Sequence, residues 1–309
     1  MREQIDLSNL LKNIETVPQN GAINVYAVKN NHVRQRDIFS VAMPEDINGN
    51  AIESICENLS KFQNAKCIDF DPINTKEETY ELLPFEKIKT TWENIEKAIN
   101  NSTGFKSKES KEKAKIANLL AVELAYNGIR YFLCSKQKPI IQLFKGKTAF
   151  CEANDKLEEI PIDNFYVLSF NIDFIVPCDK SGIFIFNKKN FISVFNYDEY
   201  LKENVEKRIN IIDDWKFISS LDIIKECAAQ KNVYKNLSKV FDDDEYLQQI
   251  KNIDSKTLKK RLLEKSEASF NEDDFDKTKL KITKSNLDKV MKMLGKGFKY
   301  NFFSDKAEE

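Results

Sequence analysis

Two apolar runs separated by a short turn constrain the fold of this chain more than any other feature. The residues Asn164–Pro177 and Gly182–Asn187 are rich in Phe, Ile and Val. Between them, Cys178–Ser181 is short and polar enough to form a turn. Two such runs are typical of neighbouring antiparallel strands. The sequence therefore predicts a sheet that is largely antiparallel.

The spacing of apolar residues predicts more strands and helices in the first two thirds of the chain. Further strands are expected at Ala22–Lys29, Val33–Met43, Cys67–Phe70, Glu81–Phe85, Ile129–Leu133, Pro139–Phe144 and Thr148–Cys151, the last two joined as a hairpin. Helices are expected at residues 5–15, Asn48–Gln63, Trp92–Ile99, Ile116–Tyr126 and Tyr197–Asp213.

Beyond Asp214 the pattern becomes mainly helical. Short polar breaks separate four segments in which apolar residues have helical spacing, at Ser220–Ala229, Tyr234–Val240, Asp243–Ile250 and Ser255–Ser266. An acidic linker, a short strand and a last helix that ends before Gly295 then follow at Asn271–Asp276, Lys279–Ile282 and Ser285–Leu294. We expect an α+β protein with a mixed or antiparallel sheet and flanking helices over 1–214, and a helical C-terminal region over 215–309 that returns one short strand.

The composition argues against the common cofactor-dependent enzymes. The chain of 309 residues is 41% hydrophobic, which is enough for a sizeable core, but it contains only 8 Gly and 7 Pro. None of the glycines has the spacing of a phosphate loop or a dinucleotide fingerprint. The 6 cysteines are scattered and the 1 histidine, His32, stands in a polar turn, so paired metal ligands and a Cys-His or Ser-His-Asp centre have no local support. We expect no metal and no cofactor.

The segments that direct proteins to membranes are also missing from the pattern. The first residues, Met1–Asp6, carry acidic groups where a signal peptide would have a basic and then an apolar run. The most apolar stretch, Asn164–Pro177, contains Asn171 and Asp173 and is shorter than the roughly 20 residues of a membrane-spanning helix. The sequence therefore predicts a cytoplasmic protein that reaches a membrane only through a partner.

The carboxylate clusters have ordinary structural explanations. A magnesium-dependent nuclease needs two or three converging carboxylates, whereas adjacent ones, as in Asp69 with Asp71 or Asp213 with Asp214, point apart. The run Asp242–Glu245 precedes an apolar helix and fits helix capping. Asp173 is different because it lies within an apolar run and must find a partner there, and we favour a structural hydrogen-bond acceptor over catalysis. No residue is assigned a catalytic role.

Lysines are concentrated near the C-terminus. Between residues 277 and 299, Asp288 is the single acidic residue beside eight lysines. Such an excess suits a polyanion, because phosphates are neutralised by clustered cations whatever the base sequence. A solvated lysine-rich surface is the alternative explanation. The predicted nucleic-acid-binding residues are Lys279, Lys281, Lys284, Lys289, Lys292, Lys296 and Lys299.

Five segments carry a resemblance to a known family. They are Asn171–Ile175, Ile183–Asn187, Phe191–Tyr197, Leu287–Leu294 and Tyr300–Ser304. An Asp in an apolar strand, a second strand ending in Asn, and then a helix opening with Phe and Tyr resemble the core of the KwaB-like family of the Kiwa anti-phage system. The resemblance implies a cytoplasmic, DNA-binding protein that works beside a membrane-embedded partner, KwaA. It implies no catalytic residues.

Three hypotheses follow from these observations. In the first, the chain is a defence protein that holds the phosphate backbone of DNA through its lysines, works with the KwaA-like partner and forms a homodimer or larger assembly. In the second, it is an interaction or sensor subunit that does not bind DNA. The third, a metal-dependent nuclease, is motivated only by the carboxylate clusters.

Overall fold

The computed structural model divides the chain into two compact units. Unit 1 comprises Met1–Phe70 and Thr75–Tyr197, and unit 2 comprises Asp71–Asn74 and Asp198–Glu309. The structure describes residues 23–30, 38–44, 48–73, 76–126, 129–138, 149–153, 156–160, 166–212, 215–241, 244–265, 268–298, 300–304 and 306–307.

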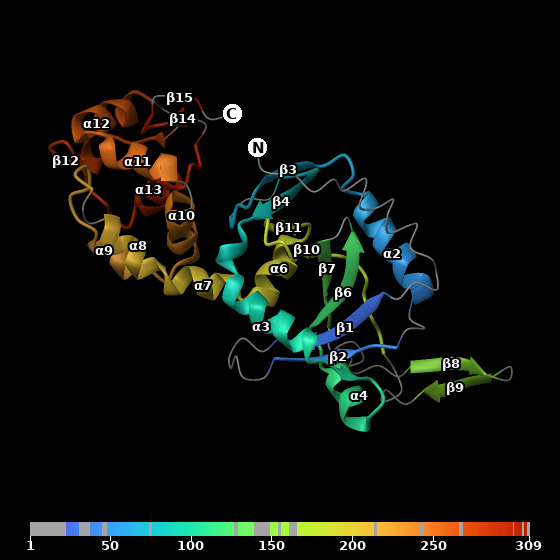
Figure 1. Ribbon diagram of the computed structural model, residues 1–309. Coiled ribbons are helices and arrows are strands. Elements are labelled where there is room, and N and C mark those ends of the chain that lie inside the picture. The colour runs from blue at the N-terminus through green and yellow to red at the C-terminus, as the bar shows by residue number, and fades with distance from the viewer. Residues whose placement is uncertain are drawn as a thin grey trace. The chain divides into compact units, whose positions relative to one another are not determined.

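Unit 1 is built on a nine-stranded mixed sheet (Figure 1). In sheet order its strands are β3 (Lys66–Asp69), β4 (Thr79–Leu83), β11 (Ile183–Ile185), β10 (Phe174–Pro177), β7 (Ile129–Lys136), β6 (Leu119–Tyr126), β1 (Asn24–Lys29), β2 (Phe39–Ala42) and β5 (Thr103–Gly104). The pairs β3–β4 and β2–β5 are parallel and the other pairs are antiparallel. The predicted fold class, α+β with a mixed sheet, is confirmed.

One face of the sheet is covered by helix α2 (Asn48–Ser60). Leu133, Ile175 and Phe184 are register partners on neighbouring strands, so their side chains share a face. They form one apolar cluster with Ile55 and Leu59 of α2. This cluster is the core between α2 and the sheet.

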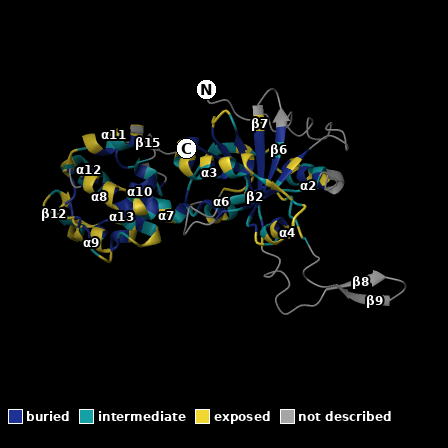
Figure 2. Ribbon diagram, turned by 60° about the horizontal axis from the view of Figure 1, so that its bottom comes forward, coloured by how far each residue is buried: buried dark blue, intermediate teal, exposed yellow. Residues whose placement is uncertain are grey.

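The opposite face is covered by helices α3 (Lys89–Asn100) and α6 (Lys188–Phe195). Trp92 of α3 lies 5.4 Å, centroid to centroid, from Phe132. Phe191 of α6 lies 5.5 Å from Phe174 of β10. The central strands are consequently buried on both faces, which Figure 2 shows as dark blue strands between helices with exposed outer surfaces.

Three further elements complete unit 1. Helix α4 (Lys108–Lys115) begins with a capping box between Ser107 and Ser110. A short 3₁₀ helix, Phe85–Lys87, follows β4. Strands β8 (Ala149–Ala153) and β9 (Lys156–Ile160) form a separate antiparallel hairpin. The sequence analysis missed β9, and the partner it expected for β8, Pro139–Phe144, lies outside the described residues, as does the helix expected at residues 5–15.

The helix predicted over Ile116–Tyr126 is wrong, because this segment contains β6. Leu119, Leu120, Ala121 and Val122 are all buried, although successive residues of a strand face opposite sides of the sheet. A strand covered on both faces is apolar throughout and has no alternation. An uninterrupted run of apolar residues therefore does not distinguish such a strand from a buried helix.

The two apolar runs pair as predicted, but the first strand is much shorter. β10 starts at Phe174, and residues 166–173 have no regular secondary structure. The side chain of Gln137 holds this irregular stretch by accepting a hydrogen bond from Ser169 N at 2.9 Å and donating one to Ser169 O at 2.8 Å. β10 and β11 are antiparallel neighbours, which confirms the pairing.

The helix predicted over Tyr197–Asp213 is two helices, α7 (Tyr197–Glu203) and α8 (Val205–Ile212). Between them, Asn204 donates a side-chain hydrogen bond to Tyr200 O at 2.8 Å. Asn196, with φ 48°, ends α6 in the left-handed region that Asn tolerates better than most residues. Asn residues thus divide this stretch into short helices.

Unit 2 is mainly helical, as expected for the C-terminal part. In addition to α7 and α8, its helices are α9 (Asp222–Glu226), α10 (Lys231–Phe241), α11 (Asp244–Asn252), α12 (Ser255–Glu264), the 3₁₀ helix Glu272–Asp274 and α13 (Leu287–Leu294). Its strands form two pairs, β12 (Phe275–Asp276) with β13 (Lys279–Leu280), and β14 (Tyr300–Asn301) with β15 (Lys306–Ala307). The predicted strand at Lys279–Ile282 is present as β13.

Helix α13 packs closely against α10, and Gly295 makes this contact possible. A Cβ atom at Gly295 would overlap the side-chain oxygen of Asn236 on α10. Asn236 is itself held by hydrogen bonds from its Nδ2 to Asn232 O and Oδ1, at 2.8 and 2.6 Å. Tyr246 of α11 donates a hydrogen bond to Met293 O at 3.1 Å. The last turn of α13 is therefore fixed on two sides.

Gly295→Ala is expected to lower the free energy of unfolding by about 1–3 kcal/mol, because the added methyl group overpacks the contact with α10. Urea unfolding followed by circular dichroism measures the loss. Gly104→Ala is the matched control, because no atom lies within 4 Å of the added Cβ. In the Gly295→Ala background, Asn236→Ala should restore most of the stability. Equal unfolding midpoints for the two glycine variants would contradict this account.

Candidate nucleic-acid interface

Asp173 is a structural acceptor at the start of β10. Its carboxylate accepts hydrogen bonds from Lys136 N at 2.7 Å and from Asn190 Nδ2 of α6 at 2.9 Å. Its backbone carbonyl accepts from Phe186 N and Asn187 N at 2.8 and 2.9 Å. The residue is buried. Asp173 thus joins β7, the end of β11 and α6, which supports the structural interpretation made from the sequence.

Burial raises the pKa of Asp173 above its ordinary value of 3.8, and the hydrogen bonds from Lys136 N and Asn190 oppose this rise without cancelling it. The ion pair between Glu81 and Lys188 lies on the face of the sheet that α6 covers. Glu81 Oε1 is 2.6 Å from Lys188 Nζ, and both side chains are nearly buried. Sequence analysis missed this pair, because 107 positions separate its members and only strand pairing brings them together.

The other carboxylates do not gather into a metal site within the described part of the chain. There, no three His, Cys, Asp or Glu residues are placed to hold a metal ion. Asp71 forms an ion pair with Lys239 at 2.8 Å. His32, Asp213, Asp214, Asp242 and Asp243 lie outside the described residues.

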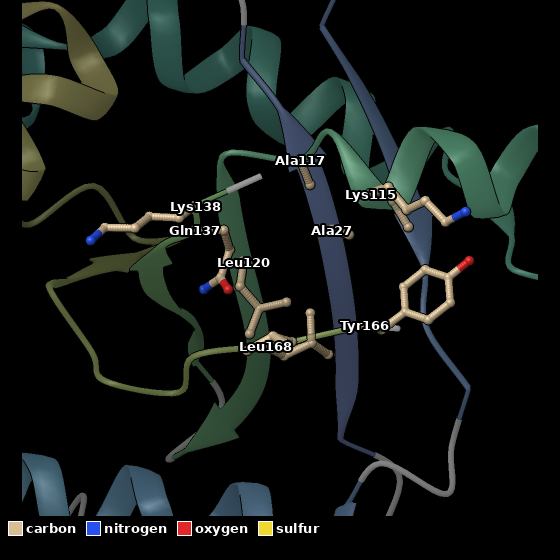
Figure 3. A pocket seen from close by; sticks show the side chains of 10 residues that line it. Ala27, Lys115, Ala117, Leu120, Gln137, Lys138, Tyr166 and Leu168 are labelled. Atoms are coloured by element: carbon tan, nitrogen blue, oxygen red, sulfur yellow. The ribbon is translucent and has the colours of Figure 1, made fainter. Parts of the chain in front are cut away.

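Two hollows of the described surface do not suit a phosphate. In unit 1, a cavity of about 10 Å³ beside β1 and β6 has room for one water molecule. Figure 3 shows Lys115 and Lys138 extending away from it in different directions. In unit 2, an open groove of about 470 Å³ lies between α11 and α12, and Glu245 and Asp254 oppose Arg261 along it. The candidate interface is therefore the lysine surface of unit 2 rather than a cavity.

Two of the predicted lysines, Lys289 and Lys292, lie on one face of α13, and Lys296 follows just past the end of the helix. Lys289 and Lys292 are three residues apart, which places them one above the other along the helix, whereas Lys296 has a left-handed φ of 55° and lies beyond it. Each ammonium group lies over an aromatic ring. The Nζ atoms of Lys289, Lys292 and Lys296 are 5.7, 4.5 and 4.4 Å from the ring centroids of Phe270, Phe298 and Tyr246. We call these three lysines the α13 stripe.

The rings below the α13 stripe hold the lysines and are themselves buried. A cation over an aromatic ring gains roughly 0.5–1 kcal/mol at an exposed site. Phe270, Phe298 and Tyr246 are each less than 9% exposed. Their faces are therefore covered by protein, and they orient the lysines rather than offering a platform for bases.

Two of the other predicted lysines, Lys279 and Lys284, have carboxylate neighbours. Lys284 is paired with Glu226 of α9, and hydrogen bonding to Glu226 raises the pKa of Lys284. Lys279 of β13 stands directly opposite Asp276 of β12. Lys281 is exposed and donates a backbone hydrogen bond to Asp274 O at 2.8 Å. We call Lys279, Lys281 and Lys284 the 279–284 lysines.

The remaining basic segments are placed as charged surfaces. Lys299 lies outside the described residues. Helix α4, which lies within the basic run Lys106–Lys115, is partly neutralised, since Lys113 pairs with Glu109 at 2.7 Å and Lys115 with Glu112 at 2.9 Å.

Comparison with protein families decides the relationship. The profile described as Kiwa protein KwaB-like matches residues 114–298. The chain belongs to the KwaB-like family. Membership assigns it to Kiwa anti-phage defence and confirms the resemblance seen in the sequence. No curated protein and no solved structure matches the chain.

The KwaB-like match spans both units. It begins at the end of α4 and includes the central strands β6, β7, β10 and β11, so Asp173 and its partners fall within it. It ends at Phe298, the residue whose ring lies under Lys292, and therefore includes the α13 stripe. Strands β1 to β5 lie outside the matched range.

Comparing the wild-type protein with Asp173→Asn should reveal the raised pKa of Asp173. The unfolded chain releases the proton of the Asp173 carboxyl group at a lower pH than the folded chain does. The free energy of unfolding of the wild type, relative to that of Asp173→Asn, therefore falls as the pH rises from below 3.8 through the raised pKa. Urea unfolding from pH 3 to about 7 measures the difference. Asp179→Asn, at an exposed turn residue, is the control. A stability difference that grows with pH would disprove the assignment.

Proposed function

We propose that this KwaB-like protein binds DNA non-specifically through lysines of unit 2 during anti-phage defence. The observation that carries the proposal is the α13 stripe, in which two lysines on one helix face and a third just past its end have their ammonium groups held over buried rings. Pre-ordered lysines lose less side-chain entropy when they bind a phosphate. Ammonium groups neutralise phosphates whatever the base sequence, so we assign the contacts of the stripe to the phosphate backbone and none to the bases.

The charge of the stripe suits a short stretch of a nucleic-acid strand. Lys289 and Lys292 are about 4.5 Å apart along the helix axis, at 1.5 Å per residue. One strand of duplex DNA carries a phosphate about every 3.4 Å along the helix axis. With Lys296 beyond the end of the helix, the stripe offers three ammonium groups and can neutralise at most about three phosphates.

We further propose that the protein acts with a membrane-embedded, KwaA-like partner from a cytoplasmic position, as a homodimer or larger assembly. This part rests on membership of the KwaB-like family. Within the described ranges, every helix is too short or too polar to span a bilayer. Attachment to a membrane through a partner is consistent with that finding.

Binding should weaken steeply with salt and should not depend on base sequence. We expect filter binding of two unrelated DNA duplexes to give equal affinities, with log K falling by about 0.9 per phosphate for each unit of log salt. Changing Lys289, Lys292 and Lys296 together to Glu should weaken binding to both duplexes alike and make the salt dependence shallower. The charge-matched control changes three exposed lysines of unit 1 to Glu, namely Lys61, Lys76 and Lys97.

Three outcomes separate the hypotheses. Unchanged affinity in the α13-stripe variant would remove the assignment to this surface. Co-purification of the membrane partner without retention of DNA would favour the interaction or sensor subunit. Cleavage of DNA after incubation with magnesium or manganese would favour the nuclease, and recovery of intact DNA would count against it.

A further inference from the structure

We propose that the carboxylates of the acidic turn Glu272–Asp276 repel a polyanion, keep it away from the 279–284 lysines and confine it to the α13 stripe. We call this turn the guard. The inference rests on the proposed function and specifies how the DNA site is regulated. It contradicts the simple expectation that all the C-terminal lysines act alike.

The acidic turn is held in one conformation. Asn271 Oδ1 accepts a hydrogen bond from Asp273 N at 3.0 Å, and Asp274 Oδ2 accepts one from Asn271 N at 3.0 Å. Asp274 Oδ1 accepts a further hydrogen bond from Asn286 Nδ2 at 2.8 Å, and Asn286 is buried at the start of α13. Asp274 is thus the structural residue of the turn, and the carboxylates of Glu272, Asp273 and Asp276 remain exposed.

The exposed carboxylates already face cations. Glu272 pairs with Lys259 of α12 at 2.6 Å, and Asp276 stands opposite Lys279 on the neighbouring strand. Glu226 of α9 supplies a further carboxylate to Lys284. A phosphate that approaches Lys279 or Lys284 meets a carboxylate that is already next to the lysine. Like charges close together repel more strongly at a protein surface than in bulk water.

The α13 stripe begins beside the residues that precede the acidic turn. Lys289 donates to Ser269 O at 2.9 Å and lies over Phe270, two residues before Glu272. Lys292 lies farther along α13, over Phe298, and Lys296 lies just past the end of the helix, over Tyr246. Within the described residues, Lys289 and Lys292 form no ion pair with a carboxylate. Asp288, the acidic residue of α13, accepts a hydrogen bond from Asn232 at 2.5 Å.

Neutralising the guard tests the proposal. The variant Glu272→Gln, Asp273→Asn and Asp276→Asn leaves Asp274 and Asn286 in place, so the turn keeps its hydrogen bonds. We expect it to bind duplex DNA at least about threefold more tightly, with a steeper salt dependence, because additional lysines contact phosphates. The control Glu53→Gln, Glu57→Gln and Glu77→Gln changes the net charge equally at exposed sites of unit 1. An equal gain in this control would overturn the proposal.

A second set of variants locates the contacts. In the wild-type background, changing Lys279, Lys281 and Lys284 to Gln should alter the affinity less than about twofold, whereas the same change in the α13 stripe should lower it more than about tenfold. In the variant with the neutralised guard, changing Lys279, Lys281 and Lys284 to Gln should lower the affinity for DNA by more than it does in the wild type. Equal losses from the two lysine sets in the wild type would overturn the guard while leaving DNA binding intact.

The two proposals fail in distinguishable ways. If the wild type binds duplex DNA and the neutralised-guard variant binds no more tightly, the guard is wrong and the proposed function stands. If neither binds, both the guard and the proposed function are wrong.

Discussion

Burial of the central strands on both faces is the constraint on which unit 1 depends. β6, β7, β10 and β11 present apolar side chains to α2 on one side and to α3 and α6 on the other. Such a sheet cannot form without helices on both faces, because either bare face would expose a large apolar area to water. The carboxylate of Asp173 then fixes α6 to this sheet, since its hydrogen bonds reach both β7 and α6.

In unit 2, contacts with neighbouring helices fix the position of α13 and of its lysines. Gly295 permits the close contact with Asn236, and Tyr246 fixes the last turn of α13 from α11. The buried side of α13 is apolar, so its lysines must lie on the remaining face. The aromatic rings of Phe270, Phe298 and Tyr246 then set the positions of the ammonium groups. Hydrophobic packing therefore determines where the positive charge is displayed.

Charge in this protein acts locally, because the whole chain is almost neutral. With 48 Lys and Arg against 49 Asp and Glu, its net charge does not favour a polyanion. A site for DNA must come from the separation of opposite charges over short distances, within which salt screening at physiological strength is incomplete. The contrast between the α13 stripe and the neighbouring acidic turn is such a separation. Under the proposed function, this separation gives the protein a limited footprint for DNA without a broadly basic surface that would bind nucleic acid throughout the cell.

The sequence by itself determined the α+β class, the antiparallel pairing of β10 with β11, the helix at Leu287–Leu294 and the local excess of lysine. Each depends on neighbours in the chain, through apolar periodicity or local charge. It did not determine that Ile116–Tyr126 contains a strand, because a strand buried on both faces has no alternation. Only the tertiary structure decided which lysines face carboxylates and which face rings. Glu226 and Tyr246 are distant in sequence from the lysines they contact, and packing alone brings them together.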